Sequence, residues 1–149
     1  MEDLVRKGKV IVSDGGQVIK FAESTLDARV ECGEVYFSKV IGGADRGWKI
    51  HAEANARVIV PIGRVVFAVA NLSFSSSSVI ELSEETGNVL TIPAGYWYRF
   101  KGLMYPISLI GCLLDIPHQV EACLPEQIEL NRRRPNIDVI WSEKRVDTA

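Results

Sequence analysis

Short β-type segments, separated by glycines and polar turns, recur along most of this chain. They are rich in valine, isoleucine and aromatic residues, and no helical 3.6-residue period replaces them before residue 117. The expected strands cover residues 9–13, 17–21, 28–31, 35–41, 49–51, 58–62, 65–70, 79–82, 88–92, 98–103 and 107–114. Regular short strands at this spacing are typical of a barrel or sandwich, so we expect an all-β fold.

The connections between these segments indicate a single domain over residues 1–149. Asp14-Gly15-Gly16 is a strong turn signal and predicts a hairpin over residues 9–21. Phe74–Ser78 ends in four serines, which predicts a polar, flexible loop, and strand signals resume directly after it. The chain changes character past residue 117, where we expect short helical pieces at 119–123 and 125–133 and an apolar segment at 137–141.

Composition excludes several classes of partner. The formal net charge is −2, which provides no bulk attraction to nucleic acid or to anionic membranes. No apolar run approaches the roughly 20 residues that a membrane-spanning helix needs, and the N-terminus lacks the apolar core of a secretory signal. Three scattered cysteines without CxxC spacing predict reduced, mostly buried thiols in a cytoplasmic protein. The expected partner is therefore a small molecule.

Two glycine-bounded stretches carry the most specific pattern, and each has the spacing of a hairpin with alternate side chains turned inward. In the first, Gly43 is followed by Lys49-Ile50-His51, then by Ala56 and by Gly63. In the second, Gly87 is followed by Pro93-Ala94-Gly95 and by Tyr98. Pro-x-Gly forms a tight corner, and the flanking glycines allow the chain to turn.

This pair of spacings resembles the two motifs of the cupin superfamily. The resemblance implies a cupin barrel, which is a double-stranded β-helix or jelly roll, with short helical C-terminal segments. Metal-binding cupins place three histidines and a glutamate at four inward positions, which are held here by Lys49, His51, Ala56 and Tyr98. Ammonium and methyl groups do not bind transition metals, and one imidazole cannot hold a metal alone. We therefore expect no metal and no cofactor.

Three pieces narrow the resemblance: Arg46-Gly47-Trp48-Lys49-Ile50-His51, the segment from Gly63 to Leu72, and Leu90-Thr91-Ile92-Pro93-Ala94-Gly95-Tyr96. They are similar to metal-free nucleotide-deoxysugar cupins, the dTDP-4-dehydrorhamnose 3,5-epimerases and the related 3,4-ketoisomerases. The similarity covers roughly residues 34–121. It implies an isomerase of surface-polysaccharide biosynthesis that transfers protons next to the 4-keto group of a nucleotide-linked sugar.

The resemblance also implies site residues. The catalytic candidates are His51, Lys49, Tyr98 and His118, and the substrate-binding candidates are Arg46, Arg57 and Tyr96. Lys49 occupies the position of the family's base histidine, and a lysine is a base only if its pKa is lowered. Ala56 stands where an enolate-stabilising lysine is usual, and the adjacent Arg57 would point to the opposite face of a strand.

Other interpretations of the same residues stay open at this point. His51 is alternatively a hydrogen-bonded barrel histidine, and Lys49 a solvated strand residue. Arg46 is alternatively a surface partner of Asp45 or Glu53. The alternative function is a catalytically inactive cupin that binds a sugar or nucleotide as an accessory or regulatory module. Either protein is expected to be a homodimer, because barrel edges and an N-terminal hairpin invite strand exchange.

Overall fold

The computed structural model describes residues 3–22, 31–117 and 146–147, and over these residues it consists of β-strands and connections without a helix. The strands are β1 (Val5–Arg6), β2 (Val10–Ser13), β3 (Gly16–Ile19), β4 (Glu34–Ile41), β5 (Lys49–Ile50), β6 (Ala56–Ile62), β7 (Arg64–Ala70), β8 (Ser77–Ser83), β9 (Val89–Ile92), β10 (Trp97–Gly102) and β11 (Ile107–Leu114). Every pairing between these described strands is antiparallel.

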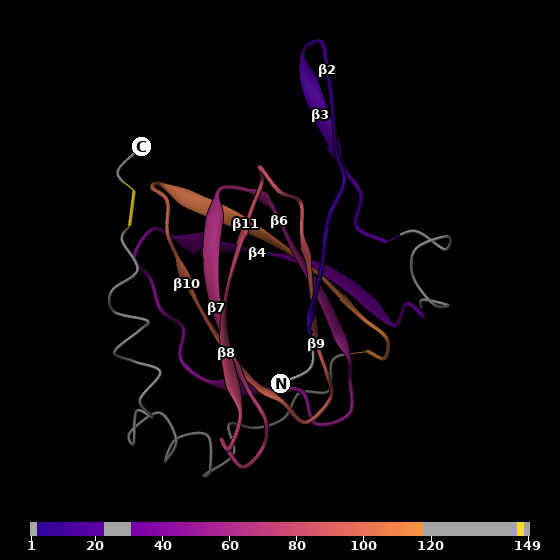
Figure 1. Ribbon diagram of the computed structural model, residues 1–149, viewed down its shortest axis with the longest axis vertical. Helices are drawn as coiled ribbons and strands as arrows, with labels where there is room; N and C mark the ends of the chain where they lie inside the picture. Colours follow the sequence, from indigo (N-terminus) through magenta and orange to yellow (C-terminus); the bar gives the residue numbers. More distant parts are fainter. Residues whose placement is uncertain (1–2, 23–30, 118–145, 148–149) are drawn as a thin grey trace.

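The strands form two larger sheets and a separate hairpin. One sheet has the order β1-β9-β6-β11-β4, the other has the order β5-β10-β7-β8, and β2 pairs with β3 alone. Figure 1 shows the β2–β3 hairpin projecting away from the body that the two larger sheets make. Antiparallel sheets with connections of this kind are a jelly-roll architecture, which confirms the predicted all-β fold class.

The core lies between the two larger sheets because each contributes one apolar face. Alternation along β4 is clear: Tyr36 and Val40 point inward, whereas Val35 and Phe37 are exposed. The largest fully buried side chains come from both sheets and their connections: Trp48, Phe67, Leu82, Leu90, Leu103 and Leu114. Strand β7 is buried along almost its whole length, as expected for a central strand that is covered on both faces.

Most of the predicted strands are confirmed, with bounds that shift by one or two residues. The prediction of a flexible loop over residues 74–78 is wrong in part, because Ser77 and Ser78 already belong to β8. Asn71 orders the turn before them through hydrogen bonds to Ser75 and Ser76. Strand β1 was not predicted, because two residues are too short to show a period. Residues 28–30 of the predicted strand 28–31 lie outside the described residues, as do the predicted segments 119–123, 125–133 and 137–141. Glu31 is described and belongs to no strand. No helix of the described part has the length and apolarity needed to cross a membrane.

Gly63 makes the tight connection between β6 and β7. Its φ is +84°, and a Cβ placed there would lie 2.3 Å from Oγ of Ser108. Ser108 is fully buried, and its hydroxyl donates to the Arg64 carbonyl and accepts from the Arg64 N–H at 3.1 Å each. A side chain at position 63 would therefore break a buried hydrogen-bonded contact as well as strain the backbone.

We predict that Gly63→Ala lowers the free energy of unfolding by roughly 1 to 3 kcal/mol, because it adds both backbone strain and a clash. Urea unfolding followed by circular dichroism measures this change. Gly16→Ala is the matched control, since a Cβ at Gly16 meets nothing within 4 Å. Equal unfolding midpoints for the two variants would contradict the role given to Gly63.

Candidate functional site

A cavity opens between the two larger sheets, and its lining combines apolar walls with a few polar groups. Its volume is about 60 Å³, which is room for a few water molecules. The lining residues come from both sheets: Tyr36, Ser38, Lys49, His51, Ala56, Val58, Phe67, Ile92, Tyr98, Phe100, Ile110 and Cys112. The four positions predicted to face inward are all among them.

The pairing of β5 with β10 brings the two glycine-bounded stretches together. Tyr98 lies directly opposite Lys49 in this antiparallel register, so their side chains are cross-strand neighbours. The N–H of Gly95 donates to the His51 carbonyl oxygen at 2.8 Å. Gly95 has a φ of +79°, so the Pro-x-Gly corner adopts the conformation for which glycine is suited.

Asn55 links these stretches to the end of β11. Its side-chain oxygen accepts from the Ala94 N–H at 2.9 Å, and its side-chain amide donates to Asp115 at 2.8 Å. The Asn55 N–H also donates to Asp115 at 2.8 Å. These bonds hold the segment between His51 and β6 against the corner that leads into β10.

His51 and Tyr98 form a hydrogen-bonded pair inside the cavity. The Tyr98 hydroxyl lies 3.0 Å from Nε2 of His51, and the two rings stack with centroids 5.3 Å apart. Burial, and to a smaller extent nearby Cys112, raises the pKa of Tyr98 above its ordinary value. The hydroxyl therefore keeps its proton at neutral pH, and the pair provides one proton donor and one acceptor in contact.

Lys49 is a half-buried cation on the same side of the cavity. Its Nζ lies 5.4 Å from the centroid of the Phe100 ring. Burial lowers the pKa of Lys49, and the like charge of Arg46 lowers it further. Among the described residues, none of those lining the cavity is a carboxylate, so no negative charge in the lining offsets these two effects.

Tyr36 and Cys112 belong to this cavity although they were not predicted as site residues. They lie directly opposite each other on β4 and β11, and both side chains line the cavity. Burial raises the pKa of both groups, that of Cys112 to about 11, so both stay protonated at neutral pH. The alternation of residues 35–41 was the available signal, since it places Tyr36 and Ser38 on one face.

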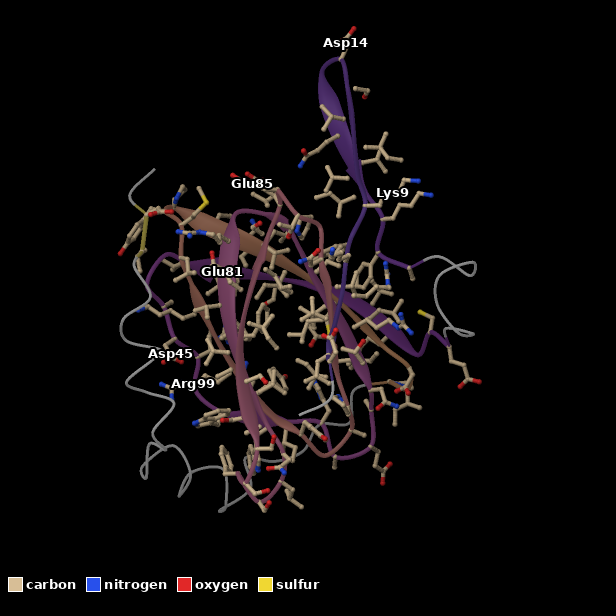
Figure 2. The ribbon with its side chains drawn as sticks, viewed as in Figure 1. Lys9, Asp14, Asp45, Glu81, Glu85 and Arg99 are labelled. Carbon is tan, nitrogen blue, oxygen red and sulfur yellow. The ribbon has the colours of Figure 1, made fainter. Side chains whose placement is uncertain are left out.

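The remaining predicted site residues lie elsewhere. Arg46 is exposed outside the cavity, and Asp45 forms an ion pair with Arg99 (Figure 2). Arg57 follows Ala56 on β6 and takes the opposite face, as alternation requires, so it does not line the cavity. Tyr96 precedes β10 and packs against the core from outside the cavity. His118 lies outside the described residues.

Metal binding finds no support in the described part of the chain. No group of three or more histidine, cysteine, aspartate or glutamate side chains converges there. Of these residue types, the described part of the cavity lining contains only His51 and Cys112, and the Cys112 thiol keeps its proton. The donor set present is therefore unsuited to a transition metal.

A second hollow of about 300 Å³ lies beside β7 and β8, and it is lined mainly by acidic side chains. Arg64 occupies it and pairs with Glu81 at 2.9 Å and with Asp147. These pairs tie the C-terminal end of the described chain to β7. The Asp147 N–H also donates to the carbonyl of Leu103, directly after β10. We therefore interpret this hollow as structural.

Comparison with solved structures found the same fold in dTDP-sugar enzymes. A dTDP sugar isomerase from Desulfovibrio desulfuricans superposes with a TM-score of 0.70 at 23% identity, over 79% of this chain and 80% of that one. A dTDP-4-dehydrorhamnose 3,5-epimerase from Bacillus anthracis, with TDP and pyrophosphate bound, gives 0.66 at 17% identity, over 78% and 73%. The 3'-monoepimerase ChmJ from Streptomyces bikiniensis, in complex with dTDP-quinovose, gives 0.68 at 13%, over 89% and 74%.

These likenesses confirm the predicted resemblance at the level of the fold. Neither the family models nor the curated proteins that were compared with the sequence gave a match. The chemistry of the site therefore has to be argued from this chain's own side chains.

We predict that Arg46→Gln raises the pKa of Lys49 toward its ordinary value, because the substitution removes a like charge. The lysines are methylated reductively with carbon-13, and an NMR titration then measures the pKa of Lys49. The resonance of Lys49 is assigned as the one that is missing in Lys49→Arg. Arg57→Gln serves as the control, since Arg57 faces away from the cavity. An unchanged Lys49 titration in Arg46→Gln would show that Arg46 does not act on the site.

Proposed function

We propose that this protein is an isomerase that moves protons next to the keto group of a nucleotide-linked 4-keto-6-deoxysugar. The observation that carries the proposal is the His51–Tyr98 hydrogen bond, 3.0 Å long, in a cavity that also holds Lys49. An acceptor, a protonated donor and a cation are the three groups that such a reaction requires. The dTDP-sugar enzymes that share the fold support the choice of substrate class.

Each group has a role that follows from its state. His51 removes the proton on the carbon next to the ketone, because imidazole is the side chain most often used to take up and return a proton. Lys49 supplies positive charge to the electrons displaced toward the carbonyl oxygen. Tyr98 keeps its proton, so it orients His51 and returns a proton as the acid. His118 stays a proposed additional acid.

The size of the cavity determines how such a substrate would lie. About 60 Å³ admits the reacting edge of a sugar ring but not a whole nucleotide sugar. Lys49 and His51 are partly exposed, so the rest of the ligand would extend past them toward solvent. Arg46 is exposed on the approach to Lys49 and is suited to bind the diphosphate. Tyr96 and Arg57 face other directions, and we give them no contact with the reacting atoms.

A second candidate function is a non-catalytic module that binds a sugar or nucleotide. The methyl group of Ala56 favours it, because this buried position offers no cation to an enolate. The same fold and pocket would then serve recognition alone. The two functions differ in one measurable property, the exchange of substrate protons with solvent.

We also propose that the protein is a cytoplasmic homodimer that acts in surface-polysaccharide biosynthesis. The outer face of the five-stranded sheet that has β4 at its edge carries four exposed apolar side chains. Their exposed fractions are 48% for Val35, 65% for Phe37, 63% for Ile41 and 53% for Ile62. The projecting hairpin exposes Val12 and Val18 as well. A second copy would cover this apolar surface, and each hairpin could add to its partner's sheet edge.

We predict that the protein exchanges the C3 or C5 protons of dTDP-4-keto-6-deoxyglucose in deuterium oxide, measured by proton NMR. His51→Ala should slow this exchange about 10²- to 10⁴-fold, because it removes the base. Tyr98→Phe should reduce it less, since the imidazole remains. Glu53→Gln is the control, an exposed neighbour that does not line the cavity. Binding of the sugar without any exchange would overturn the enzyme and favour the binding module.

We predict that the protein is dimeric at micromolar concentration and that Phe37→Glu makes it monomeric, because the substitution places a charge on the proposed interface. Analytical ultracentrifugation gives the mass. Leu72→Glu changes a similarly exposed residue, 67% against 65%, in the turn between β7 and β8, and should leave the dimer intact. A monomeric unmodified protein would contradict the proposal.

A further inference from the structure

The amine of Lys49 can act as a nucleophile as well as a positive charge. We infer that Lys49 forms a protonated imine with the keto carbon of the substrate, so that the isomerisation proceeds through covalent catalysis. This inference rests on the proposed function, because it concerns the same cavity and the same keto sugar. Unlike a purely electrostatic role of Lys49, the imine is a covalent bond to the substrate, which chemical reduction can trap.

The position of the amine carries the inference. Lys49 lines the cavity from β5, directly opposite Tyr98, and His51 follows two residues later and lines the same cavity. A keto carbon within reach of Nζ would therefore also lie close to the His51–Tyr98 pair. The outward lysine on the paired strand, Lys101, lies on the other face of β10 and does not reach this space.

The surroundings of Lys49 favour a neutral amine, which is the nucleophilic form. Burial and the Arg46 charge both lower the pKa of Lys49, and desolvation or a neighbouring cation is how imine-forming lysines are activated. Among described residues, no carboxylate lines the cavity to oppose this. The Phe100 ring, 5.4 Å from Nζ, offers the ammonium form only a weak attraction.

The proposed step balances without an oxidant or reductant. The free amine of Lys49 attacks the keto carbon, a C–N bond forms, and the electron pair of the C=O bond moves to oxygen, which takes a proton. Nitrogen loses a proton, and the hydroxyl group takes one and leaves as water. The sum is ketone plus free amine plus one proton giving protonated imine plus water. Tyr98 and His51 are the groups placed to give and take these protons.

Isomerisation then needs only proton transfers. His51 removes a proton from the carbon next to the protonated imine, and the C–H electrons form a C=C bond while the C=N electrons move to nitrogen. Return of a proton to carbon from the other face changes the configuration, and water releases the ketone and the amine. The iminium thus provides the electron sink that the methyl group of Ala56 cannot provide.

Reductive trapping tests the inference. Protein incubated with dTDP-4-keto-6-deoxyglucose and treated with sodium borohydride should gain the mass of the sugar nucleotide less one oxygen atom. Peptide mapping should place the adduct on Lys49. Lys49→Arg keeps the charge but cannot form an imine, so it should give no adduct and lose proton exchange. Lys101→Arg is the matched control and should be trapped like the unmodified protein.

The outcomes separate this inference from the proposed function. Proton exchange by the unmodified protein without an adduct, together with retained exchange in Lys49→Arg, would overturn the imine and leave the isomerase standing. Neither exchange nor adduct would overturn both. An adduct at Lys49 that is absent in Lys49→Arg, with exchange that disappears in the same variant, is the expected result. An adduct at other lysines only would also overturn the imine.

Discussion

The pairing of the two-residue strand β5 with β10 is the constraint on which the site depends. It places Lys49 opposite Tyr98, and the bond from Gly95 to the His51 carbonyl fixes the chain just beyond it. Side chains alternate along a strand, so a slip of β5 by one residue would turn Lys49 away from the cavity and from Tyr98. Asn55 resists such a slip, because it binds both the corner before β10 and Asp115 at the end of β11.

The charged side chains near the surface have carboxylate partners, whereas the described lining of the cavity around Lys49 contains no carboxylate. Arg64 and Arg99 pair with carboxylates near the surface, an arrangement that costs little and stabilises little. Lys49 lies half-buried with no carboxylate among the described residues of its cavity, where the protein disfavours its charged form. A lysine in such surroundings costs stability, and its perturbed pKa inside a cavity makes it a candidate functional residue.

Much of the fold and part of the site could be predicted from local pattern. Strand alternation and turn signals led to nearly every described strand. The resemblance to the cupin motifs led to the inward positions of Lys49, His51, Ala56 and Tyr98, which all line the cavity. Strand β1 and the first two residues of β8, Ser77 and Ser78, could not be predicted, because short or polar segments show no alternation of apolar and polar side chains. The serine segment is ordered by contacts to Asn71 that composition does not reveal.

The sequence by itself determined the all-β class, because alternation and turn chemistry are local properties, and the resemblance of its two motifs to those of cupins indicated the four positions that face inward. Only the tertiary structure decided which distant groups meet. Tyr36 and Cys112 are 76 residues apart and share the cavity through the register of β4 with β11. The protonation states of Lys49 and Tyr98 also depend on burial, which no spacing encodes. The local sequence pattern indicates which side chains face inward, and the packing of the two sheets determines their neighbours and their protonation states.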